Sequence, residues 1–238
     1  MKIAIIQAVT GLSGDVIAED EAYIKGHLRE STEITTELLS TGFSSVETAA
    51  QTVINGAKII EKVLEIQNKG YDGIFINCFD DPGVLGAREV SNIPVIGPYA
   101  ATMHYALTIS EKVAVISTDE YGIVCEKRKA REHGLENHIA AFENVGLGVL
   151  ELDDEVVAER IKTFCLEMEK LGVHAVIMGC TGMDTVADKV RQNLKDSGCT
   201  VQVLEPFKVG MKMLEMIIEM KDFNLIKSTS IDFDQYIR

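Results

Sequence analysis

Hydrophobic and polar positions follow two periods that alternate along the whole chain. Short apolar runs rich in valine and isoleucine predict strands, and the segments between them repeat apolar residues at helical spacing. The predicted strands are 3–8, 33–39, 73–77, 94–96, 113–117, 138–144, 175–179 and 201–204. The clearest helices are 46–69, 120–132, 154–171, 184–195 and 208–220. Strands that alternate with helices in this way indicate parallel sheets covered on both faces.

The longest predicted helix, 46–69, repeats apolar side chains at helical spacing. Its pattern places Val53, Ala57, Ile60 and Leu64 on one side, which predicts the apolar face of the helix. Gly70 follows as a C-terminal stop, because glycine accepts the left-handed conformation that often ends a helix.

The two halves of the chain resemble each other segment by segment. Lys2–Ile6 is similar to Lys112–Ile116, Gly70–Cys78 to Gly172–Cys180, and Ile96–Tyr99 to Leu204–Phe207. The offsets between these partners are 110, 102 and 108 residues, and so nearly constant a shift indicates an internal duplication. We therefore predict an α/β protein with two similar lobes, each built on a roughly four-stranded parallel sheet flanked by helices.

Length, composition and charge favour a compact enzyme that acts on a small molecule. The chain has 238 residues, of which 46% are hydrophobic, enough for a sizeable core. Its formal net charge of -14 argues against a nucleic acid or an anionic membrane as partner, because both attract lysine and arginine. The N-terminus lacks a secretory leader pattern, and no run approaches the roughly 18 apolar residues that span a bilayer. We expect a cytoplasmic protein.

The cysteines and histidines do not form a metal or disulfide pattern. Five cysteines, an odd number without CxxC spacing, fit neither a disulfide framework nor a zinc knuckle, so reduced thiols are expected. His104 has no second histidine at ligand spacing, and the glycines form neither a dinucleotide fingerprint nor a P-loop. We expect no metal and no cofactor.

Cys78 and Cys180 each close a predicted strand, at equivalent positions of the two halves. Ligands of parallel sheets bind beyond the carboxyl ends of the strands, where both thiols are expected. After Cys78, Asp81 is predicted to cap a helix and Pro82 to be its first residue, and after Cys180 a helix is again expected at once. A helix N-terminus favours a thiolate by only about 0.3 to 1 kcal/mol. Further donors, such as the Thr181 hydroxyl or backbone amides, must therefore assist.

A single cysteine at a strand end is usually a packing residue, because cysteine is among the most commonly buried residue types. Two cysteines at equivalent strand ends of duplicated halves indicate a catalytic role instead. Cys165 lies within an amphipathic helix and is predicted to belong to the core, whereas the surroundings of Cys125 and Cys199 suggest no role.

The motifs around the two cysteines resemble those of a known superfamily. The segment 77–83, with 87–89 and 94–97, looks like the first cysteine motif of the hydantoin racemases, and 178–183 resembles the second cysteine motif of the aspartate/glutamate racemase superfamily. The loop 41–47 also resembles the Gly-Pro-x-Ser-Ile-Glu loop of hydantoin racemases, with Phe43 in place of proline. The resemblance spans most of the chain.

This resemblance implies a cofactor-independent racemase with two catalytic cysteines. Cys78 and Cys180 match the catalytic positions, where one thiolate removes the proton on the α-carbon and the opposite thiol returns a proton to the other face. The superfamily further implies two lobes about a pseudo-twofold axis with substrate between them, and a final helix that returns to the first lobe. The lobes would then be 1–97 with 208–238, and 98–207. Homo-oligomers are common among relatives.

The resemblance also implies the substrate-binding positions. They are the residues around the cysteine motifs and at three strand ends: Thr10, Ser44, Ser45, Asn77, Phe79, Thr118, Thr181 and Gly182. For Ser44, Ser45 and Thr118 ordinary capping and turn formation is an equally good interpretation. The first strand departs from the family, whose Asn-x-Asn-Thr run is replaced by Gln7-Ala8-Val9-Thr10, so a polar substrate contact is missing or moved.

Several functions are compatible with these features. A 5-substituted hydantoin ranks first as substrate, because its C5 proton is easier to remove than that of a free amino acid, and aspartate or glutamate ranks second. A decarboxylase or a cis-trans isomerase of the same superfamily is a further alternative, although decarboxylase relatives keep only the second cysteine. A two-lobed small-molecule binding protein and a thiol redox protein are the alternatives of other classes. The redox protein would need the two thiols close enough for a disulfide.

Overall fold

The computed structural model describes residues 1–221, and the chain divides into two compact units. The first unit comprises Met1–Pro98 together with the chain from Gly210, and the second comprises Tyr99–Val209. The last part of the predicted first lobe, 222–238, lies outside the described residues. Each unit carries one four-stranded sheet whose strands are all parallel, so the predicted α/β fold is confirmed.

The sheet of the first unit has the strand order β2-β1-β3-β4. Its strands are β1 (Lys2–Gln7), β2 (Glu33–Leu38), β3 (Gly73–Asn77) and β4 (Val95–Ile96). Its helices are α1 (Gly14–Lys25), α2 (Ala49–Ile66), α3 (Val84–Val90) and most of α8 (Pro206–Met220). Every residue of β3 is buried, as expected for a central strand of a parallel sheet with covered faces.

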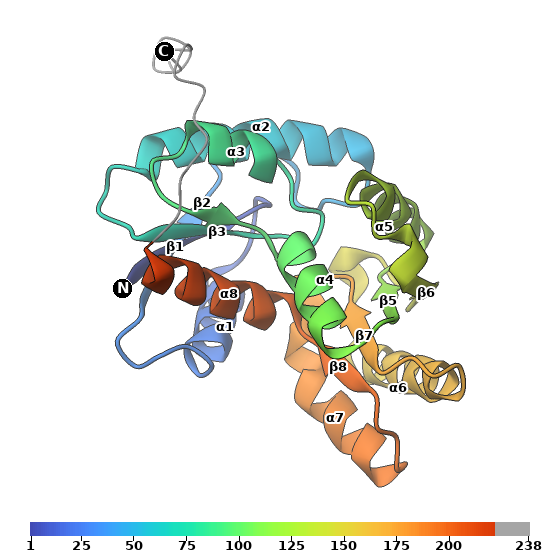
Figure 1. Ribbon diagram of the computed structural model, residues 1–238. Coiled ribbons are helices and arrows are strands. Elements are labelled where there is room, and N and C mark those ends of the chain that lie inside the picture. Colours follow the sequence, from blue (N-terminus) through green and yellow to red (C-terminus); the bar gives the residue numbers. More distant parts are fainter. Residues whose placement is uncertain (222–238) are drawn as a thin grey trace. The chain divides into compact units, whose positions relative to one another are not determined.

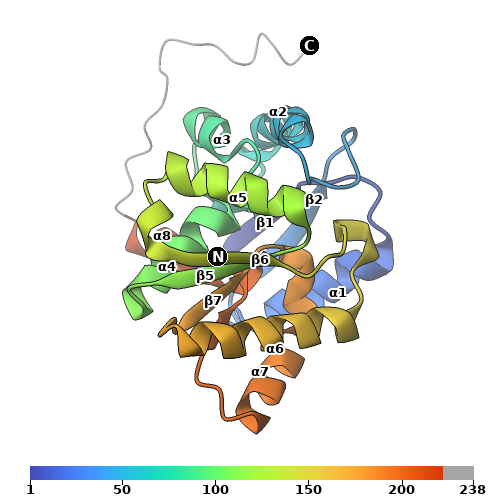
Figure 2. The ribbon, with the colours of Figure 1, turned by 90° about the vertical axis from the view of Figure 1, so that its right-hand side faces the viewer.

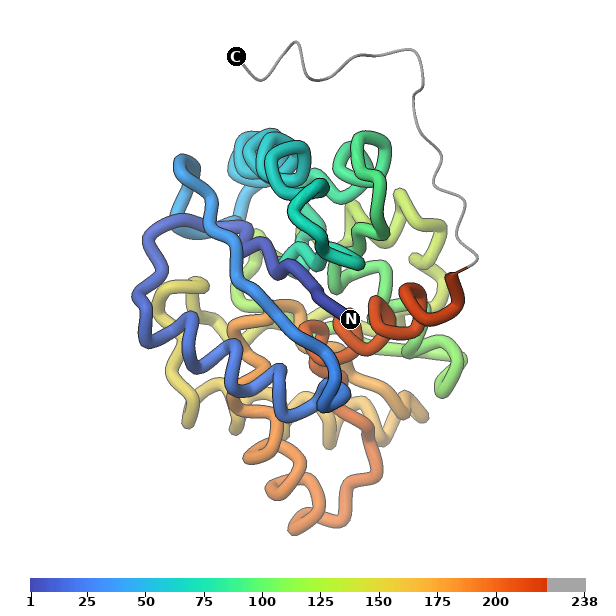
Figure 3. The backbone as a smooth tube through the Cα atoms, turned by 90° about the vertical axis from the view of Figure 1, so that its left-hand side faces the viewer, coloured from blue at the N-terminus to red at the C-terminus, as the bar shows by residue number. Residues whose placement is uncertain are grey.

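Helices cover both faces of this first sheet (Figures 1 and 3). Helices α2 and α3 lie on one face, and α1 and α8 lie on the other. On the α8 face, the backbone of Gly73 in β3 approaches Leu214 and Ile218 so closely that an added Cβ would lie 3.0 and 2.9 Å from their side chains. Glu215 of α8 is buried and accepts a 2.6 Å hydrogen bond from the Thr32 hydroxyl. These contacts attach α8 to the first sheet.

The second sheet has the order β6-β5-β7-β8 and therefore repeats the first position by position. Its strands are β5 (Val113–Ser117), β6 (Ile139–Asn144), β7 (Ala175–Met178) and β8 (Gln202–Leu204). Its helices are α4 (Pro98–Ile109), α5 (Glu120–Glu132), α6 (Asp154–Lys170) and α7 (Ala187–Asp196). Short 3₁₀ helices cover 136–138, 149–151 and 181–186. Figure 2 shows α5 on one face of the sheet and α6 and α7 on the other.

The apolar face predicted for the longest helix is wrong. Val53 is 71% exposed, whereas the buried residues of α2 are Asn55, Gly56, Ile59, Val63 and Ile66. The reason is a close backbone contact, because the Cα of Gly56 packs against Gly83 and leaves no room for a Cβ at either residue. The helix therefore turns its glycine and its asparagine inward, and these two residues carry no hydrophobic signal.

Candidate active site

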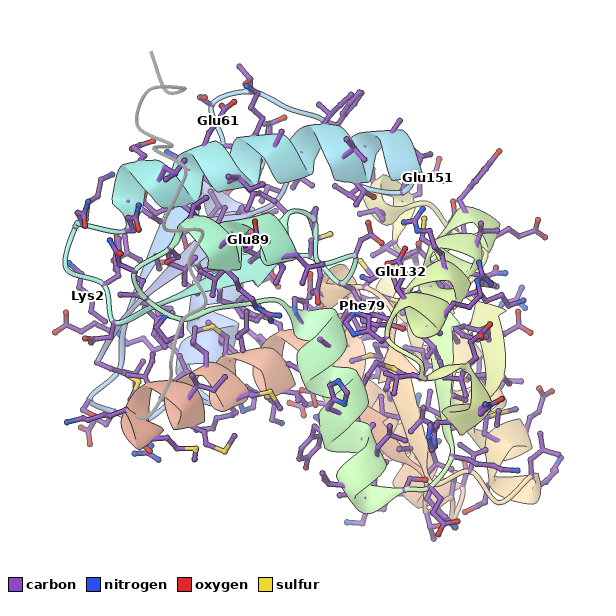
Figure 4. The ribbon with its side chains drawn as sticks, turned by 45° about the horizontal axis from the view of Figure 1, so that its top comes forward. Lys2, Glu61, Phe79, Glu89, Glu132 and Glu151 are labelled. Atoms are coloured by element: carbon purple, nitrogen blue, oxygen red, sulfur yellow. The ribbon has the colours of Figure 1, made fainter. Side chains whose placement is uncertain are left out.

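The first cysteine follows the central strand of the first sheet. Cys78 is partly exposed and comes directly after β3, and its carbonyl accepts a 3.0 Å hydrogen bond from the amide of Asp81. Phe79 is buried and lies in the connection that leads from β3 toward α3 (Figure 4). Asp80 accepts a short hydrogen bond from the Thr52 hydroxyl of α2. The chain after Cys78 is thus held in a defined turn.

The helix expected directly after Cys78 does not begin there. Asp81 adopts a left-handed conformation with φ 47°, and α3 begins only at Val84 behind Gly83, which makes no side-chain cap. Asp81 turns instead toward Gly97, where a Cβ would collide with its carboxylate. The predicted cap by Asp81 and first helical turn at Pro82 are therefore wrong. The left-handed turn at Asp81 brings Gly83 into close contact with Gly56 of α2, and α3 begins only after this contact.

The serine loop after β2 is attached to the end of β1. Thr10 donates from its amide to the Phe43 carbonyl at 3.0 Å and from its hydroxyl to the Gly42 carbonyl at 3.1 Å. Ser45 is buried and its hydroxyl donates to Glu47 at 3.0 Å, whereas Ser44 is exposed. Thr10 and the serine loop therefore lie together at the carboxyl edge of the first sheet.

Asn55 of α2 holds this loop in place. Its Nδ2 donates to the carbonyls of Ala8 at 2.8 Å and Phe43 at 3.2 Å, and its Oδ1 accepts from the Phe43 amide at 2.9 Å. The side chain is fully buried. One amide thus joins the end of β1, the serine loop and α2. Asn55 could not be found from the sequence, because a lone asparagine within a helix has no distinctive motif.

Asn77, the last residue of β3, belongs to a second polar contact at the same edge. Its Nδ2 donates to Oε1 of Gln7 at 3.1 Å, and Nε2 of Gln7 donates to Oδ2 of Asp20 on α1 at 3.1 Å. Gln7 and Asn77 are buried partners in neighbouring strands. Burial raises the pKa of Asp20 to about 6, and the nearby carboxylates Glu19 and Glu21 raise it further against the lowering effect of Gln7.

The second cysteine occupies the equivalent place in the second unit. Cys180 follows β7 and is partly exposed, and it precedes the 3₁₀ helix 181–186 rather than an α-helix. The α-helix expected at once after the thiol begins only at Ala187. Gly182 lies beside the sulfur, since an added Cβ would be 3.5 Å from Sγ. Thr181 directly follows the cysteine and is partly exposed.

The surroundings of Cys180 favour its thiol form. Burial raises the pKa of Cys180 to about 12, and the carboxylates of Asp184 and Glu126 raise it as well. Hydrogen bonds from the backbone amides of Gly182 and Met183 lower it, but they do not outweigh burial. The expected backbone donors are therefore present, whereas the expected depression of the pKa is wrong for this cysteine. Burial destabilises the thiolate more than the two amide hydrogen bonds stabilise it.

Two further residues stand near the strand ends of the second unit. Thr118 directly follows β5, is buried, and accepts hydrogen bonds at its carbonyl from the amides of Gly146 and Leu147, at 3.0 and 3.1 Å. Glu126 on α5 is 4% exposed, and its carboxylate lies where a Cβ of Gly179 would be. Glu126 could not be found from the sequence, because an acidic residue inside a charged helix usually faces solvent.

The predicted site residues thus fall into two sets, each at the carboxyl edge of one sheet. In the first unit these are Thr10, Ser44, Ser45, Asn77, Cys78 and Phe79, and in the second unit they are Thr118, Cys180, Thr181 and Gly182. The predicted core cysteine, Cys165, is fully buried, as expected. All five cysteines are free thiols.

Residues 1–221 contain neither a candidate metal site nor a membrane-spanning helix. No group of three or more histidine, cysteine, aspartate or glutamate side chains in this part of the chain could hold a metal ion. None of the helices described there is both long enough and apolar enough to cross a membrane.

Comparison with known proteins gives consistent matches. Residues 14–214 match the family model described as Asp/Glu/Hydantoin racemase. The hydantoin racemase of Rhizobium meliloti is 30% identical over 178 residues, which cover 74% of this chain and 72% of that protein. A hydantoin racemase from a Pseudomonas species is 25% identical over 223 residues, covering 92% and 87% of the two chains. The solved allantoin racemase from Klebsiella pneumoniae is 26% identical with a TM-score of 0.83, covering 98% of each chain.

Proposed function

This chain belongs to the Asp/Glu/hydantoin racemase family, and we propose that it racemises a 5-substituted hydantoin by moving the C5 proton with Cys78 and Cys180. As a member of this family the protein is an isomerase. The observation that carries the two-cysteine proposal is the equivalence of the thiols. Cys78 directly follows β3 and Cys180 comes two residues after the end of β7, so each lies just beyond the third strand, counted along the chain, of its own sheet, and the two sheets have the same strand order.

The chemistry needs one base and one acid on opposite faces of the same carbon. One cysteine thiolate forms a bond to the C5 proton, and the electrons of the C–H bond pass into the ring as an enolate. The other thiol then gives its proton to C5 from the opposite face, which leaves the enantiomer. The acid and the base have exchanged roles, so the reverse reaction uses the same two groups. No electron is gained or lost, and no co-reactant is needed.

The state of Cys180 suggests which thiol starts as the acid. With its pKa raised to about 12 by burial, Cys180 is a thiol near neutral pH and is ready to donate. Its two backbone hydrogen bonds, from Gly182 and Met183, would stabilise the thiolate that forms after donation. Cys180 therefore serves as the resting acid.

A hydantoin suits this site better than a free amino acid. The C5 hydrogen of a hydantoin lies beside a ring carbonyl, which takes up the developing charge, whereas the carboxylate of a free amino acid already carries a negative charge. The Rhizobium and Pseudomonas relatives, at 30% and 25% identity, are both named hydantoin racemases. Allantoin, the substrate in the name of the Klebsiella protein, is itself a hydantoin with a ureido group on C5. One substrate class thus includes both.

Proton exchange in heavy water tests this function. Single enantiomers of 5-substituted hydantoins, allantoin, aspartate and glutamate would be incubated with the protein, while NMR follows exchange at the α-carbon and circular dichroism follows handedness. We expect exchange together with loss of optical activity for the hydantoins. Cys78→Ser and Cys180→Ser should each abolish racemisation, and the control Cys199→Ser should keep it. Ligand binding without exchange would instead support a binding protein. Exchange with amino acids alone would show that the substrate is an amino acid and not a hydantoin.

A further inference from the structure

Asn77, Gln7 and Asp20 form a continuous hydrogen-bonded relay that ends next to Cys78. Gln7 and Asn77 face each other across β1 and β3, and Asp20 reaches Gln7 from α1. Gln7 is 3% exposed and Asn77 is 9% exposed. Among the described residues, Oδ1 of Asn77 is a buried atom that has no hydrogen-bond partner. A buried carbonyl oxygen without a donor is costly, so a donor from a ligand would be stabilising there.

The direction of the relay follows from the carboxylate at its far end. An ionised carboxylate can only accept hydrogen bonds, so Gln7 must turn its NH₂ group toward Asp20. The Gln7 oxygen then faces Asn77, which must donate a hydrogen bond to it from its own NH₂ group. Both amides are thereby oriented, and the remaining oxygen of Asn77 is left as an acceptor. The charge on Asp20 thus determines whether position 77 offers an acceptor or a donor.

We propose that the relay from Asp20 through Gln7 orients Asn77 so that its amide oxygen accepts a hydrogen bond from a ring N–H of the substrate. This inference rests on the proposed function, and it makes Asp20 and Gln7 positioning residues for Asn77. Asn77 is the last residue of β3 and directly precedes Cys78, at the carboxyl edge where parallel sheets bind ligands. Both ring nitrogens of a hydantoin carry hydrogens, whereas a carboxylate presented to this oxygen would be repelled.

Gln7 is the central residue of the relay. The Asn-x-Asn-Thr run of hydantoin racemases is Gln7-Ala8-Val9-Thr10 in this chain. The longer glutamine side chain spans from β1 to both Asn77 and Asp20. Gln7 thereby links the carboxylate of Asp20 to the amide of Asn77 on the neighbouring strand.

Protonation of Asp20 removes the constraint on the relay. A neutral carboxyl can donate to the Gln7 oxygen, after which both amides can reverse and Asn77 would present its NH₂ group instead. Burial raises the pKa of Asp20 to about 6, with Glu19 and Glu21 on the same helix adding to the effect. The nearby β2 also contributes Thr36, which donates to Glu21 rather than to Asp20. Binding of an N–H substrate should therefore weaken as the pH falls through about 6.

Steady-state kinetics with matched substrates tests the contact. For the wild type we expect KM to rise about three- to tenfold when the ring nitrogen that donates to Asn77 is methylated. Since both ring nitrogens carry a hydrogen, both the 1-methyl and the 3-methyl compounds are measured. In Asn77→Ala that penalty should disappear for the same compound, while KM for the unmethylated hydantoin rises. An equal methyl penalty in the wild type and in Asn77→Ala, for both isomers, would overturn the proposal.

Substitution at the far end of the relay tests the positioning role. The asparagine side chain of Asp20→Asn has the same shape as aspartate but can donate as well as accept hydrogen bonds. We therefore expect a severalfold higher KM at pH 7.5 and a kcat within about twofold of the wild type. KM of this variant should not change between pH 5 and 7. The control is Glu19→Gln on the same helix, because Gln7 donates to Asp20 and not to Glu19. This variant should keep the wild-type KM at pH 7.5, and the change of KM with pH should occur at slightly lower pH, because Glu19 raises the pKa of Asp20. A wild-type KM profile in Asp20→Asn would contradict the relay.

Side-chain NMR separates failure of the relay from failure of the proposed function. If the protein racemises no hydantoin, the substrate proposal fails, but the relay is still measured directly. The ¹H–¹⁵N resonances of the Gln7 and Asn77 amides should titrate together near pH 6 in the wild type and stay constant in Asp20→Asn. Resonances of Asn77 that do not respond to the pH would overturn the relay whatever the substrate is.

Discussion

The carboxylate of Glu126 lies against Gly179, the residue directly before Cys180, in the space that a side chain at position 179 would fill. Glu126 comes from the middle of α5 and Gly179 from the end of β7, so the pair joins a buried negative charge to the strand end that carries the second thiol. The contact requires glycine at 179 and keeps the charge near the sulfur. Two predictions follow from this one relationship.

Removing the charge of Glu126 should make Cys180 more acidic. Its carboxylate raises the pKa of the Cys180 thiol, after burial and together with Asp184. In Glu126→Gln the pKa should fall below the wild-type value of about 12, and alkylation of Cys180 by iodoacetamide at pH 9 should become severalfold faster. Mass spectrometry of the modified peptide measures this rate. Glu132→Gln, at the exposed end of the same helix, is the control, and equal rates in both variants would contradict the prediction.

Adding a methyl group at position 179 should destabilise the second unit. The Cβ of Gly179→Ala would collide with Glu126 and lie 3.0 Å from the Ile116 carbonyl oxygen. We expect a loss of about 1 to 3 kcal/mol in the free energy of unfolding, together with loss of racemisation, because Cys180 is displaced. Denaturant unfolding measures the first effect. Gly14→Ala is the matched control, since a Cβ there meets nothing within 4 Å, and it should unfold like the wild type.

Asn55→Ala should loosen the serine loop of the first unit. The substitution removes three hydrogen bonds and leaves the buried Ala8 carbonyl and the part-buried Phe43 amide without the Asn55 side chain, whereas the Phe43 carbonyl keeps the Thr10 amide. The expected loss is about 1 to 3 kcal/mol of unfolding free energy, and KM should rise more than kcat falls if the loop binds substrate. Glu61→Gln, an exposed change on the same helix (Figure 4), should leave both unchanged. An unaltered KM in a destabilised Asn55→Ala would separate the loop from substrate binding.

The stability of the protein should depend on the charge of Asp20. Its pKa is raised from 3.8 to about 6, mainly by burial, so the folded state binds this proton more tightly than the unfolded state. The stabilisation from this proton is complete below pH 3.8 and is lost as the pH rises through about 6. At pH 8 Asp20→Asn should therefore be more stable than the wild type by about 1 to 3 kcal/mol.

Denaturant midpoints at pH 4 and pH 8 check this prediction. The difference between Asp20→Asn and the wild type should grow with pH. When Glu19→Gln is added to both proteins, the pH range over which this difference in stability grows should shift to lower pH, because Glu19 is one of the charges that raise the pKa of Asp20. A difference that is the same at both pH values would contradict the predicted role of Asp20.

Most strands and the two thiol positions could be predicted because they depend on local patterns. The buried strands β3 and β5 coincide with the predicted 73–77 and 113–117, since continuous apolar runs between turn residues leave little choice of boundary. Cys78 and Cys180 were placed at strand ends by the same patterns, reinforced by the internal duplication. The start of α3 was predicted wrongly, because the turn at Asp81 depends on a contact with Gly97, and the close approach of Gly83 to Gly56 involves a residue 27 positions away along the chain.

The sequence by itself determined the alternation of strands and helices, the repeat of the two halves and the placement of one cysteine after the third strand of each. These features rest on side-chain periodicity and on order along the chain, which are properties of neighbouring residues. Only the tertiary structure decided that Glu126 lies at Gly179, that Asn55 holds the serine loop and that Asp20 reaches Asn77 through Gln7. Each of these pairs polar groups that are distant in sequence, and burial makes their hydrogen bonds and charges matter only once the chain has folded.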